Sequence, residues 1–299
     1  MKHGILGAGG VGGTIGTILA QYGENVTLIV RPGTTLQYPP DITLESTFST
    51  ISAPALVTDA LRHPVDILWI TVKATQLEAA LASIPGHPPF HAVVPFLNGV
   101  DHVRVLRQKF GNIVFSATIA GEMERTAPGK YVHPSPFLRI HLASAGQQVL
   151  QPAADLFTRF GADCKFFDDE ATLLWSKLVI LAPFALSTTA AGSTIGGVQA
   201  NPDRWRLLQD CVREACAAAV AYGAQVDADA AIEMLAASPP DMRSSMQKDV
   251  AAGRVPELDA IAGPILRWAL SSSRGAPATA KLVEEIRARS QAGKEQSMS

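Results

Sequence analysis

A glycine-rich loop near the start of the chain constrains the fold more than any other feature. The segment "GILGAGGVGGTIG" places Gly7, Gly9 and Gly12 in GxGxxG spacing, after an apolar run typical of a strand and before a stretch typical of a helix. In such loops the first glycine permits a tight turn, the second lets the backbone approach a pyrophosphate, and the third lets helix and strand pack closely. The loop therefore predicts a dinucleotide site formed by Gly7, Ala8, Gly9, Gly10, Val11 and Gly12.

The first half of the chain alternates short apolar runs with amphipathic stretches. The apolar runs are residues 3–6, 25–30, 66–72, 91–97 and 112–117. Because they are rich in Val, Ile and Leu and are bounded by Gly, Pro, Asn or Asp, they predict buried parallel strands. Helices are expected between them at 12–22 and 75–84, so the alternation predicts a Rossmann-type doubly wound α/β sheet. A strand pair is expected at 129–144, with two prolines in its turn.

After Phe167 the sequence becomes rich in alanine and leucine with helical periodicity. The segment "DDEATLL" supplies acids suited to a helix N-terminus. Later helices are expected at 203–222, 228–236, 241–252, 257–271 and 277–292. A chain of 299 residues exceeds what one core usually serves. We therefore expect a dinucleotide-binding Rossmann domain over 1–167 and an all-α domain over 168–299.

Composition argues against several classes of partner. The net charge is -2 and there is no basic run, which argues against nucleic acid or an anionic membrane surface. No stretch reaches the ~20 uncharged apolar residues of a membrane span. Three cysteines without metal-type spacing and seven scattered histidines predict no metal site. We expect a cytoplasmic protein with reduced thiols and a small-molecule partner.

Polar residues follow three of the predicted strands. Arg31 comes directly after the second strand, where an NAD site usually has an acid that binds the ribose 2′-hydroxyl. Since a guanidinium can instead pair with a 2′-phosphate, the expected cofactor is NADP(H). Lys73 and Asn98 follow two later strands, and ligands of open α/β sheets bind beyond the carboxyl ends of strands. Both residues are therefore expected to meet cofactor or substrate.

One lysine stands in an otherwise apolar helix, "WSKLVILAPFAL", residues 175–186. At helical spacing Lys177 is followed by Leu181 and Ala185. Apolar surroundings depress the pKa of a lysine and suit it to proton transfer near neutral pH, whereas a lysine that extends to solvent keeps its hydration. The residues alone leave both interpretations open. Pro183 is expected to kink or interrupt this helix.

Several motifs occur together in order along the chain. They are "GILGAGGVGG", the arginine after the second strand, "VKATQ", "LNGV", "PGKYVHP", "LWSKL" and "SSMQKDVAAGRVPELDAIAG". This set resembles the ketopantoate reductase (2-dehydropantoate 2-reductase) family through both expected domains. The resemblance implies NADPH-dependent reduction of a 2-keto acid, as in pantothenate biosynthesis, at a site between a Rossmann and a helical domain. It implies that Lys177 is the proton donor, that Asn98 touches nicotinamide and substrate, that Glu257 anchors the cofactor and a polar network, and that Ser245 binds the substrate carboxylate.

The sequence also departs from that family. Leu181 and Ala185 stand where the family has substrate-binding asparagines, and a third asparagine position falls near Ile195. Because lost hydrogen bonds reduce specificity for a polar substrate, a larger or more apolar ketone is expected, with Leu181 and Ala185 in the substrate site. Asp249 is as well suited to stabilising a helix as to catalysis.

Three alternatives for the function and the question of oligomeric state stay open at this stage. The protein could instead be a non-catalytic NADP(H)-binding redox sensor, a dehydrogenase working in the oxidising direction, or a ketopantoate reductase with pocket polar groups at other positions. The alanine-rich helices would serve equally as a homodimer interface or as an intramolecular core.

Overall fold

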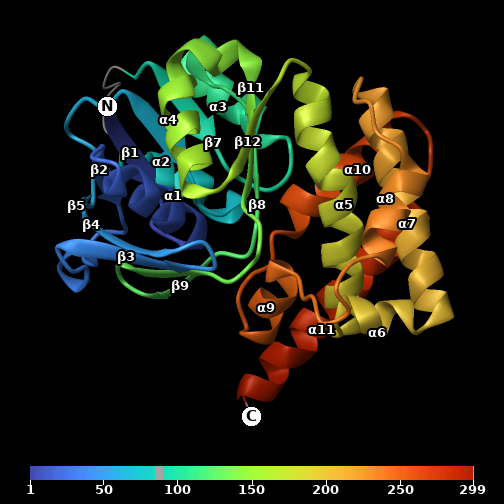
Figure 1. Cartoon of the computed structure of the whole chain (residues 1–299). Coiled ribbons are helices and arrows are strands. Elements are labelled where there is room, and N and C mark those ends of the chain that lie inside the picture. Colours follow the sequence, from blue (N-terminus) through green and yellow to red (C-terminus); the bar gives the residue numbers. More distant parts are fainter. Residues whose placement is uncertain (85–89, 299) are drawn as a thin grey trace. The chain divides into compact units, whose positions relative to one another are not determined.

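In the computed structural model, which describes residues 1–84 and 90–298, a five-stranded parallel sheet carries the glycine loop (Figure 1). Its order is β5-β2-β1-β6-β7. The strands are β1 (Lys2–Leu6), β2 (Asn25–Ile29), β5 (Leu56–Thr58), β6 (Ile67–Ile70) and β7 (Ala92–Pro95). Every residue of β6 and β7 is buried, as expected of parallel strands covered on both faces. The Rossmann-type sheet predicted from the sequence is confirmed.

Two smaller sheets complete the strands of the described chain. The first has the order β4-β3-β10-β9 and the second β12-β11-β8. Their strands are β3 (Asp41–Ser46), β4 (Thr50–Pro54), β8 (Ala117–Ala120), β9 (Glu124–Ala127), β10 (Lys130–His133), β11 (Arg139–Ala143) and β12 (Asp163–Phe167). Both strands predicted within 129–144 are present, as β10 and β11. Their predicted pairing with each other is wrong, because β10 pairs with β3 and β9 whereas β11 pairs with β8 and β12.

The predicted strand at 112–117 is also wrong over most of its length. Gly111–Ile113 form a short 3-10 turn, and Val114 makes only an isolated bridge to Val93. The regular strand β8 begins at Ala117. Apolar content was therefore a guide to burial here, but not to which residues join a ladder.

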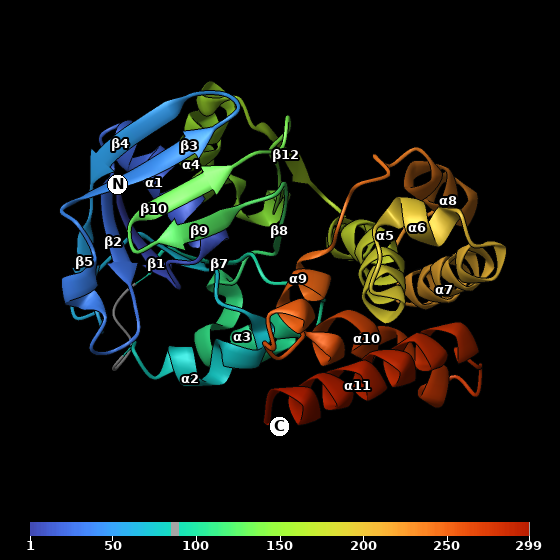
Figure 2. The same ribbon diagram turned by 90° about the horizontal axis from the view of Figure 1, so that it is seen from below.

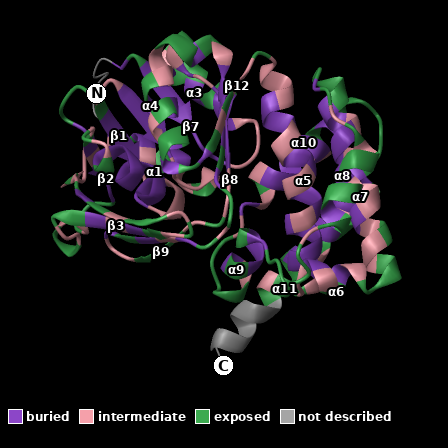
Figure 3. Ribbon diagram, in the orientation of Figure 1, coloured by how far each residue is buried: buried purple, intermediate pink, exposed green. Residues whose placement is uncertain are grey.

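Helix α1 (Gly10–Gln21) lies between two sheets. It contacts β1 and β2 on one side and the β4-β3-β10-β9 sheet on the other. Residues from Gly12 to Ala20 are all buried, which Figure 3 shows as a continuous purple helix. The other helices that begin before residue 170 are α2 (Leu77–Leu81), α3 (His102–Phe110) and α4 (Gln147–Phe160). Burial on both sides makes α1 a fixed support for the loop that precedes it.

The remainder of the described chain is helical (Figure 2). It comprises α5 (Glu170–Ala191), α6 (Ile195–Gln199), α7 (Pro202–Ala221), α8 (Ala228–Ala236), α9 (Ser245–Ala251), α10 (Leu258–Ser271) and α11 (Pro277–Met298). Side chains of Asn201, Asp227 and Ser244 cap α7, α8 and α9, which sets where these helices begin. The all-α character predicted for this part is confirmed.

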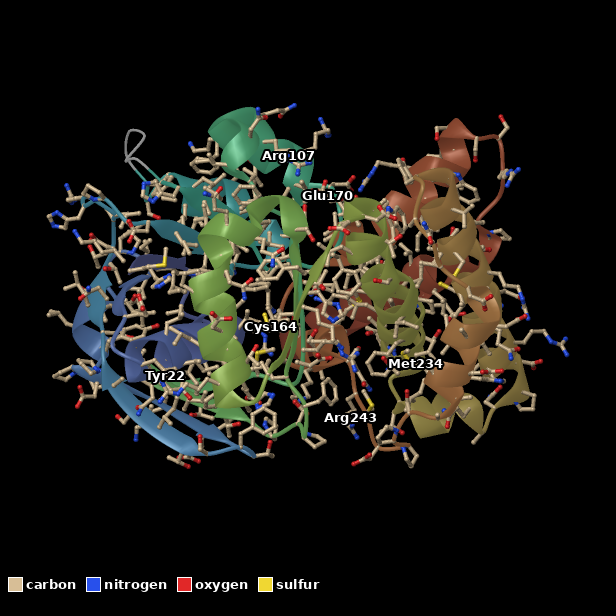
Figure 4. The ribbon with its side chains drawn as sticks, turned by 45° about the horizontal axis from the view of Figure 1, so that its top comes forward. Tyr22, Arg107, Cys164, Glu170, Met234 and Arg243 are labelled. Atoms are coloured by element: carbon tan, nitrogen blue, oxygen red, sulfur yellow. The ribbon has the colours of Figure 1, made fainter. Side chains whose placement is uncertain are left out.

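The start of α5 is fixed by acidic side chains. A carboxylate oxygen of Asp169 accepts a hydrogen bond from the backbone N–H of Ala171 at 3.0 Å. Glu170 pairs with Arg107, whose Nη1 lies 2.8 Å from Oε1 (labelled in Figure 4). Carboxylates at this end of a helix also interact favourably with its dipole. The helix start that the acidic run predicted is therefore present.

Helix α5 is by length and composition the one helix in the described ranges that could cross a membrane. However, 61% of its most apolar window is buried inside the structure, as in the core helix of a folded domain. The helix runs unbroken through Pro183, so the expected interruption is wrong. Proline removes one N–H from the ladder, yet the helix continues here with Ala182, Pro183 and Ala185 all buried.

The contacts divide the chain into two compact units. The first comprises Met1–Leu97 and His102–Leu173, and the second comprises Asn98–Asp101 and Leu174–Ser299. The short segment after β7 thus belongs with the helices. The boundary at 167 and the roles expected of the two parts stay predictions.

Candidate active site

Three polar side chains of the second unit form one hydrogen-bonded chain. Lys177 on α5 donates from Nζ to Oδ1 of Asn98 at 3.0 Å, and Nδ2 of Asn98 donates to Oε2 of Glu257 at 3.2 Å. Because an ammonium only donates and a carboxylate only accepts, the two neighbours fix which way the amide points. Glu257 is buried just before α10. The fold thus joins three of the residues singled out in the sequence.

The environment of Lys177 suits it to hold and release a proton. Burial lowers the pKa of Lys177 from 10.5 to about 8, and the negative charge of Glu257 partly opposes this fall. The side chain is half-buried, with its ammonium bonded to an amide instead of extending freely into water. A lysine with a pKa of this size is present in both protonation states near neutral pH, which general acid–base chemistry requires.

A glycine and an ion-pair network hold Asn98 in place. Gly99 has φ +83°, and a β-carbon there would lie 2.2 Å from the carbonyl oxygen of Ala260. Asp101 pairs with Arg267, whose Nη1 also lies 2.7 Å from Oδ1 of Asp259. These contacts pin the segment to the start of α10. Sequence analysis singled out Asn98 but did not predict this network. The Asn98–Gly99 dipeptide, which is typical of turns, was the only local signal in the sequence.

The face of α5 that carries Lys177 is apolar. Ile180, Leu181 and Phe184 are half-buried on it, within two turns of the lysine. Ala185 and Ile195 are buried in the interior at 1% and 0% exposure. Of the three positions that depart from the family's asparagines, only Leu181 therefore shares the partly exposed face with the lysine.

Two serines at the start of helix α9, Ser244 and Ser245, differ in their surroundings. Oγ of Ser244 is buried, accepts from the backbone N–H of Gln247 at 3.1 Å and lies 3.0 Å from the hydroxyl of Thr188. Ser245 is exposed, so its hydroxyl is accessible to a ligand. Asp249 is buried and accepts a bond of 2.8 Å from Nε of Arg254. That ion pair favours a stabilising role for Asp249.

The glycine loop of the first unit contains two kinds of glycine. Gly7 has φ +101°, and a β-carbon at Gly12 would lie 2.1 Å from the carbonyl oxygen of Gly7, so the loop itself requires both. A β-carbon at Gly9 would meet no atom within 4 Å. That open space suits the close approach of a pyrophosphate. Helix α1 has no side-chain cap and no acid in its first turn, which leaves its N-terminus suited to an anion.

Arg31 and Lys73 follow strands that flank β1 on its two sides. β2 and β6 both run parallel to β1, so the two residues lie beyond the same edge of the sheet. Arg31 is exposed, and no carboxylate pairs with it in the described part of the chain. Lys73 is half-buried at the start of a 3-10 turn, Ala74–Gln76. Among the side chains that the structure describes, residues 1–84 and 90–291, no group of three or more His, Cys, Asp or Glu could hold a metal ion.

A Rossmann-type sheet with an open glycine loop, followed by a helical unit with a lysine-centred polar chain, is typical of nicotinamide-dependent oxidoreductases. The sequence profile described as "Ketopantoate reductase PanE/ApbA" matches residues 3–147, and the profile of that family's C-terminal part matches residues 171–290. The chain belongs to the ketopantoate reductase PanE/ApbA family.

Individual proteins are similar over almost the whole chain. A 2-dehydropantoate 2-reductase of Caulobacter vibrioides is 28% identical over 293 residues, which cover 95% of this chain and 97% of the relative. The crystal structure of a PanE/ApbA family ketopantoate reductase from Ralstonia eutropha has a TM-score of 0.85 at 23% identity and covers 98% of this chain and 100% of that one. D-mandelate dehydrogenase, solved with NADH and anilino(oxo)acetate, has a TM-score of 0.84 at 19% identity, with 98% and 99% covered.

Proposed function

We propose that the protein is an NADPH-dependent reductase that converts a 2-keto acid or a related ketone to the corresponding hydroxy compound. The observation that carries this proposal is the Lys177–Asn98–Glu257 chain, in which burial brings the pKa of the lysine to about 8. A proton donor with this pKa, in a family of ketopantoate reductases, fits reduction of a carbonyl group better than binding alone.

In the proposed reaction Lys177 supplies the proton. A bound nicotinamide dinucleotide supplies a hydride to the carbonyl carbon. As the carbonyl π bond breaks, negative charge grows on the oxygen, and the ammonium of Lys177 stabilises it and transfers a proton from Nζ. The product has gained one hydride and one proton, and the lysine takes up a proton from water. Glu257 favours the protonated lysine, and Asn98 orients it.

The residues of the first unit fit the cofactor. The open space at Gly9 and the uncapped start of α1 would take the pyrophosphate, with Ala8, Gly10 and Val11 supplying backbone to the loop. Arg31 would pair with the 2′-phosphate that distinguishes NADPH from NADH, and Lys73 would add a second positive charge at this edge. A preference for NADPH is part of the proposal, since D-mandelate dehydrogenase was solved with NADH.

The apolar face of α5 favours a substrate with an apolar side chain. Leu181, Ile180 and Phe184 offer hydrocarbon beside the ammonium, whereas the exposed hydroxyl of Ser245 would meet the carboxylate. The name of the mandelate enzyme shows that this fold serves an aromatic 2-hydroxy acid in another protein. We therefore favour a branched or aromatic 2-keto acid over ketopantoate.

The test is NADPH oxidation with ketopantoate, phenylglyoxylate and branched 2-keto acids side by side. Faster turnover of phenylglyoxylate or a branched acid supports the proposal in full, and faster turnover of ketopantoate refutes the substrate preference. The reverse reaction, with 2-hydroxy acids and NADP⁺, shows which direction is faster. Binding of NADPH without turnover of any of these compounds would refute the reductase and favour a redox sensor.

A further inference from the structure

A second arginine contacts the glycine loop from outside the parallel sheet. Arg125 lies on β9, in the sheet that packs against α1. Its Nη1 donates to the carbonyl oxygen of Ala8 at 3.5 Å and to the hydroxyl of Tyr38 at 3.0 Å. Ala8 immediately precedes Gly9, where the loop is open. The guanidinium therefore lies beside Gly9, the glycine of this loop whose presence packing does not explain.

The segment before β9 keeps Arg125 close to the start of α1. The carbonyl oxygen of Met123 would lie 2.2 Å from a β-carbon at Gly10, the first residue of the helix. Because of this close contact, position 10 must be glycine. The same contact fixes the backbone at Met123, two residues before Arg125. Arg125 is thus held next to a helix N-terminus, whose N–H groups and dipole favour an anion.

The guanidinium of Arg125 has N–H donors that the two contacts above do not use. Arg125 is exposed, and in the ranges that the structure describes no carboxylate pairs with it. The next residue towards the N-terminus, Glu124, points to the opposite face of the strand because side chains alternate. A guanidinium has five N–H donors, and both contacts of Arg125 use the same nitrogen. The remaining N–H donors can form bidentate hydrogen bonds with phosphate oxygens.

A buried tyrosine shows that the polar cluster is incomplete. Tyr131 on β10 is directly opposite Arg125 in the strand register, and its ring would lie 2.0 Å from a β-carbon at Gly13. Burial raises the pKa of Tyr131, the nearby Tyr38 adds to this rise, and the charge of Arg125 opposes it, so the three groups interact. Yet the Tyr131 hydroxyl is buried without a hydrogen-bond partner among the described residues. Such a group costs free energy and commonly marks a missing ligand or solvent contact.

We propose that Arg125 binds the pyrophosphate of the nicotinamide dinucleotide, reaching the glycine loop from a second sheet. The inference rests on the proposed dinucleotide binding. It assigns two different tasks to two arginines: Arg31 discriminates between cofactors at the 2′-phosphate, whereas Arg125 contributes to the affinity for both.

The test compares dissociation constants of NADPH and NADH, measured from the fluorescence of the bound cofactor. The variants are Arg125→Ala, Arg125→Lys, Arg31→Ala and, as a control, Arg139→Ala, an exposed arginine on β11 of another sheet. Loss of charge-assisted hydrogen bonds to phosphate should weaken both cofactors by the same factor, about tenfold or more, in Arg125→Ala. Arg125→Lys should lose less, Arg31→Ala should weaken NADPH only, and the control should change neither.

Two results would overturn the assignment. If Arg125→Ala weakens NADPH alone, the guanidinium binds the 2′-phosphate; if both constants stay unchanged, Arg125 only supports the loop. Thermal unfolding checks that each variant is folded. If Arg125→Ala is not folded, the dissociation constants of the charge-retaining Arg125→Lys decide whether Arg125 binds the pyrophosphate. If the wild-type protein binds neither cofactor, the proposed function is refuted as well. If the wild type binds and Arg125→Ala has the same dissociation constants, only this inference is refuted.

Discussion

Replacing Lys177 by methionine removes a charge that the fold holds in an apolar setting. The pKa of this lysine falls from 10.5 to about 8 through burial, despite the opposing charge of Glu257. Each pKa unit corresponds to ~1.4 kcal/mol, so the protonated lysine lowers the free energy of unfolding by about 3 kcal/mol relative to its neutral form. This cost is present below pH 8 and disappears as the pH rises towards the pKa of the unfolded chain.

The sign of the pH dependence follows from proton counts. Between the folded and unfolded pKa values the unfolded chain binds more protons, so the free energy of unfolding rises with pH. Lys177→Met lacks this contribution. The wild type should therefore gain about 2.5 kcal/mol of stability relative to the variant between about pH 7 and about pH 10. Contributions of titrating groups that do not interact with Lys177 cancel in this difference.

Urea unfolding followed by tryptophan fluorescence measures this difference, because Trp175, Trp205 and Trp268 all belong to the second unit. Lys281→Met removes an exposed lysine on α11 of the same unit and serves as the control. If the free energies of unfolding of wild type and Lys177→Met change with pH in the same way, the ammonium of Lys177 is not desolvated in the folded protein and the reasoning is refuted. In the same variant turnover should fall by about 10³-fold or more while NADPH binding is retained. Wild-type reduction should decline as the pH rises above about 8, because it needs the protonated lysine.

Three further variants test the surroundings of the lysine. Asn98→Ala removes the amide that bridges ammonium and carboxylate, so turnover should fall by about 10- to 100-fold and the pH profile of reduction should move; an unchanged profile contradicts the bridge. Leu181→Asn should raise kcat/KM for ketopantoate over phenylglyoxylate by about tenfold, with Leu270→Asn as the exposed control, and equal ratios speak against the apolar face as a determinant. Gly99→Ala should lower the free energy of unfolding by more than ~2 kcal/mol, and Gly253→Ala by only ~1 kcal/mol. Both glycines have positive φ, but only at Gly99 would a β-carbon meet a backbone atom. Equal melting temperatures of the two variants would disprove the close contact.

Periodicity along the chain predicted the elements whose burial is set locally. The central strands have buried residues in unbroken runs, and the expected helix at 228–236 coincides with α8 because Asp227 caps it. The strand pair at 129–144 failed for the opposite reason. Its two halves are β-forming, but their partners lie far away in the sequence, and local pattern says nothing about which distant edge a strand will join.

The site was predictable where residues follow strands and much less so elsewhere. Asn98 stood out from its position alone, and Lys177 from its apolar neighbours. Glu257 came from the family resemblance, because nothing local distinguishes it from other acids before helices. Gly99 was noted only within the motif "LNGV". Arg125 was not singled out, since an arginine on an irregular strand carries no pattern that points to a ligand. The catalytic and binding roles of all these residues stay predictions.

The assignment of Asn98–Asp101 to the helical unit limits how this protein can be divided or recombined. The backbone passes between the units three times, after Leu97, after Asp101 and after Leu173. A fragment cut out at Leu174 would keep the lysine and the glutamate but lose the amide that links them, and Arg267 would lose Asp101. Exchange of helical domains between family members at that junction would therefore transfer an incomplete Lys177–Asn98–Glu257 chain. Only chimaeras that carry residues 98–101 along with the helices should keep it intact.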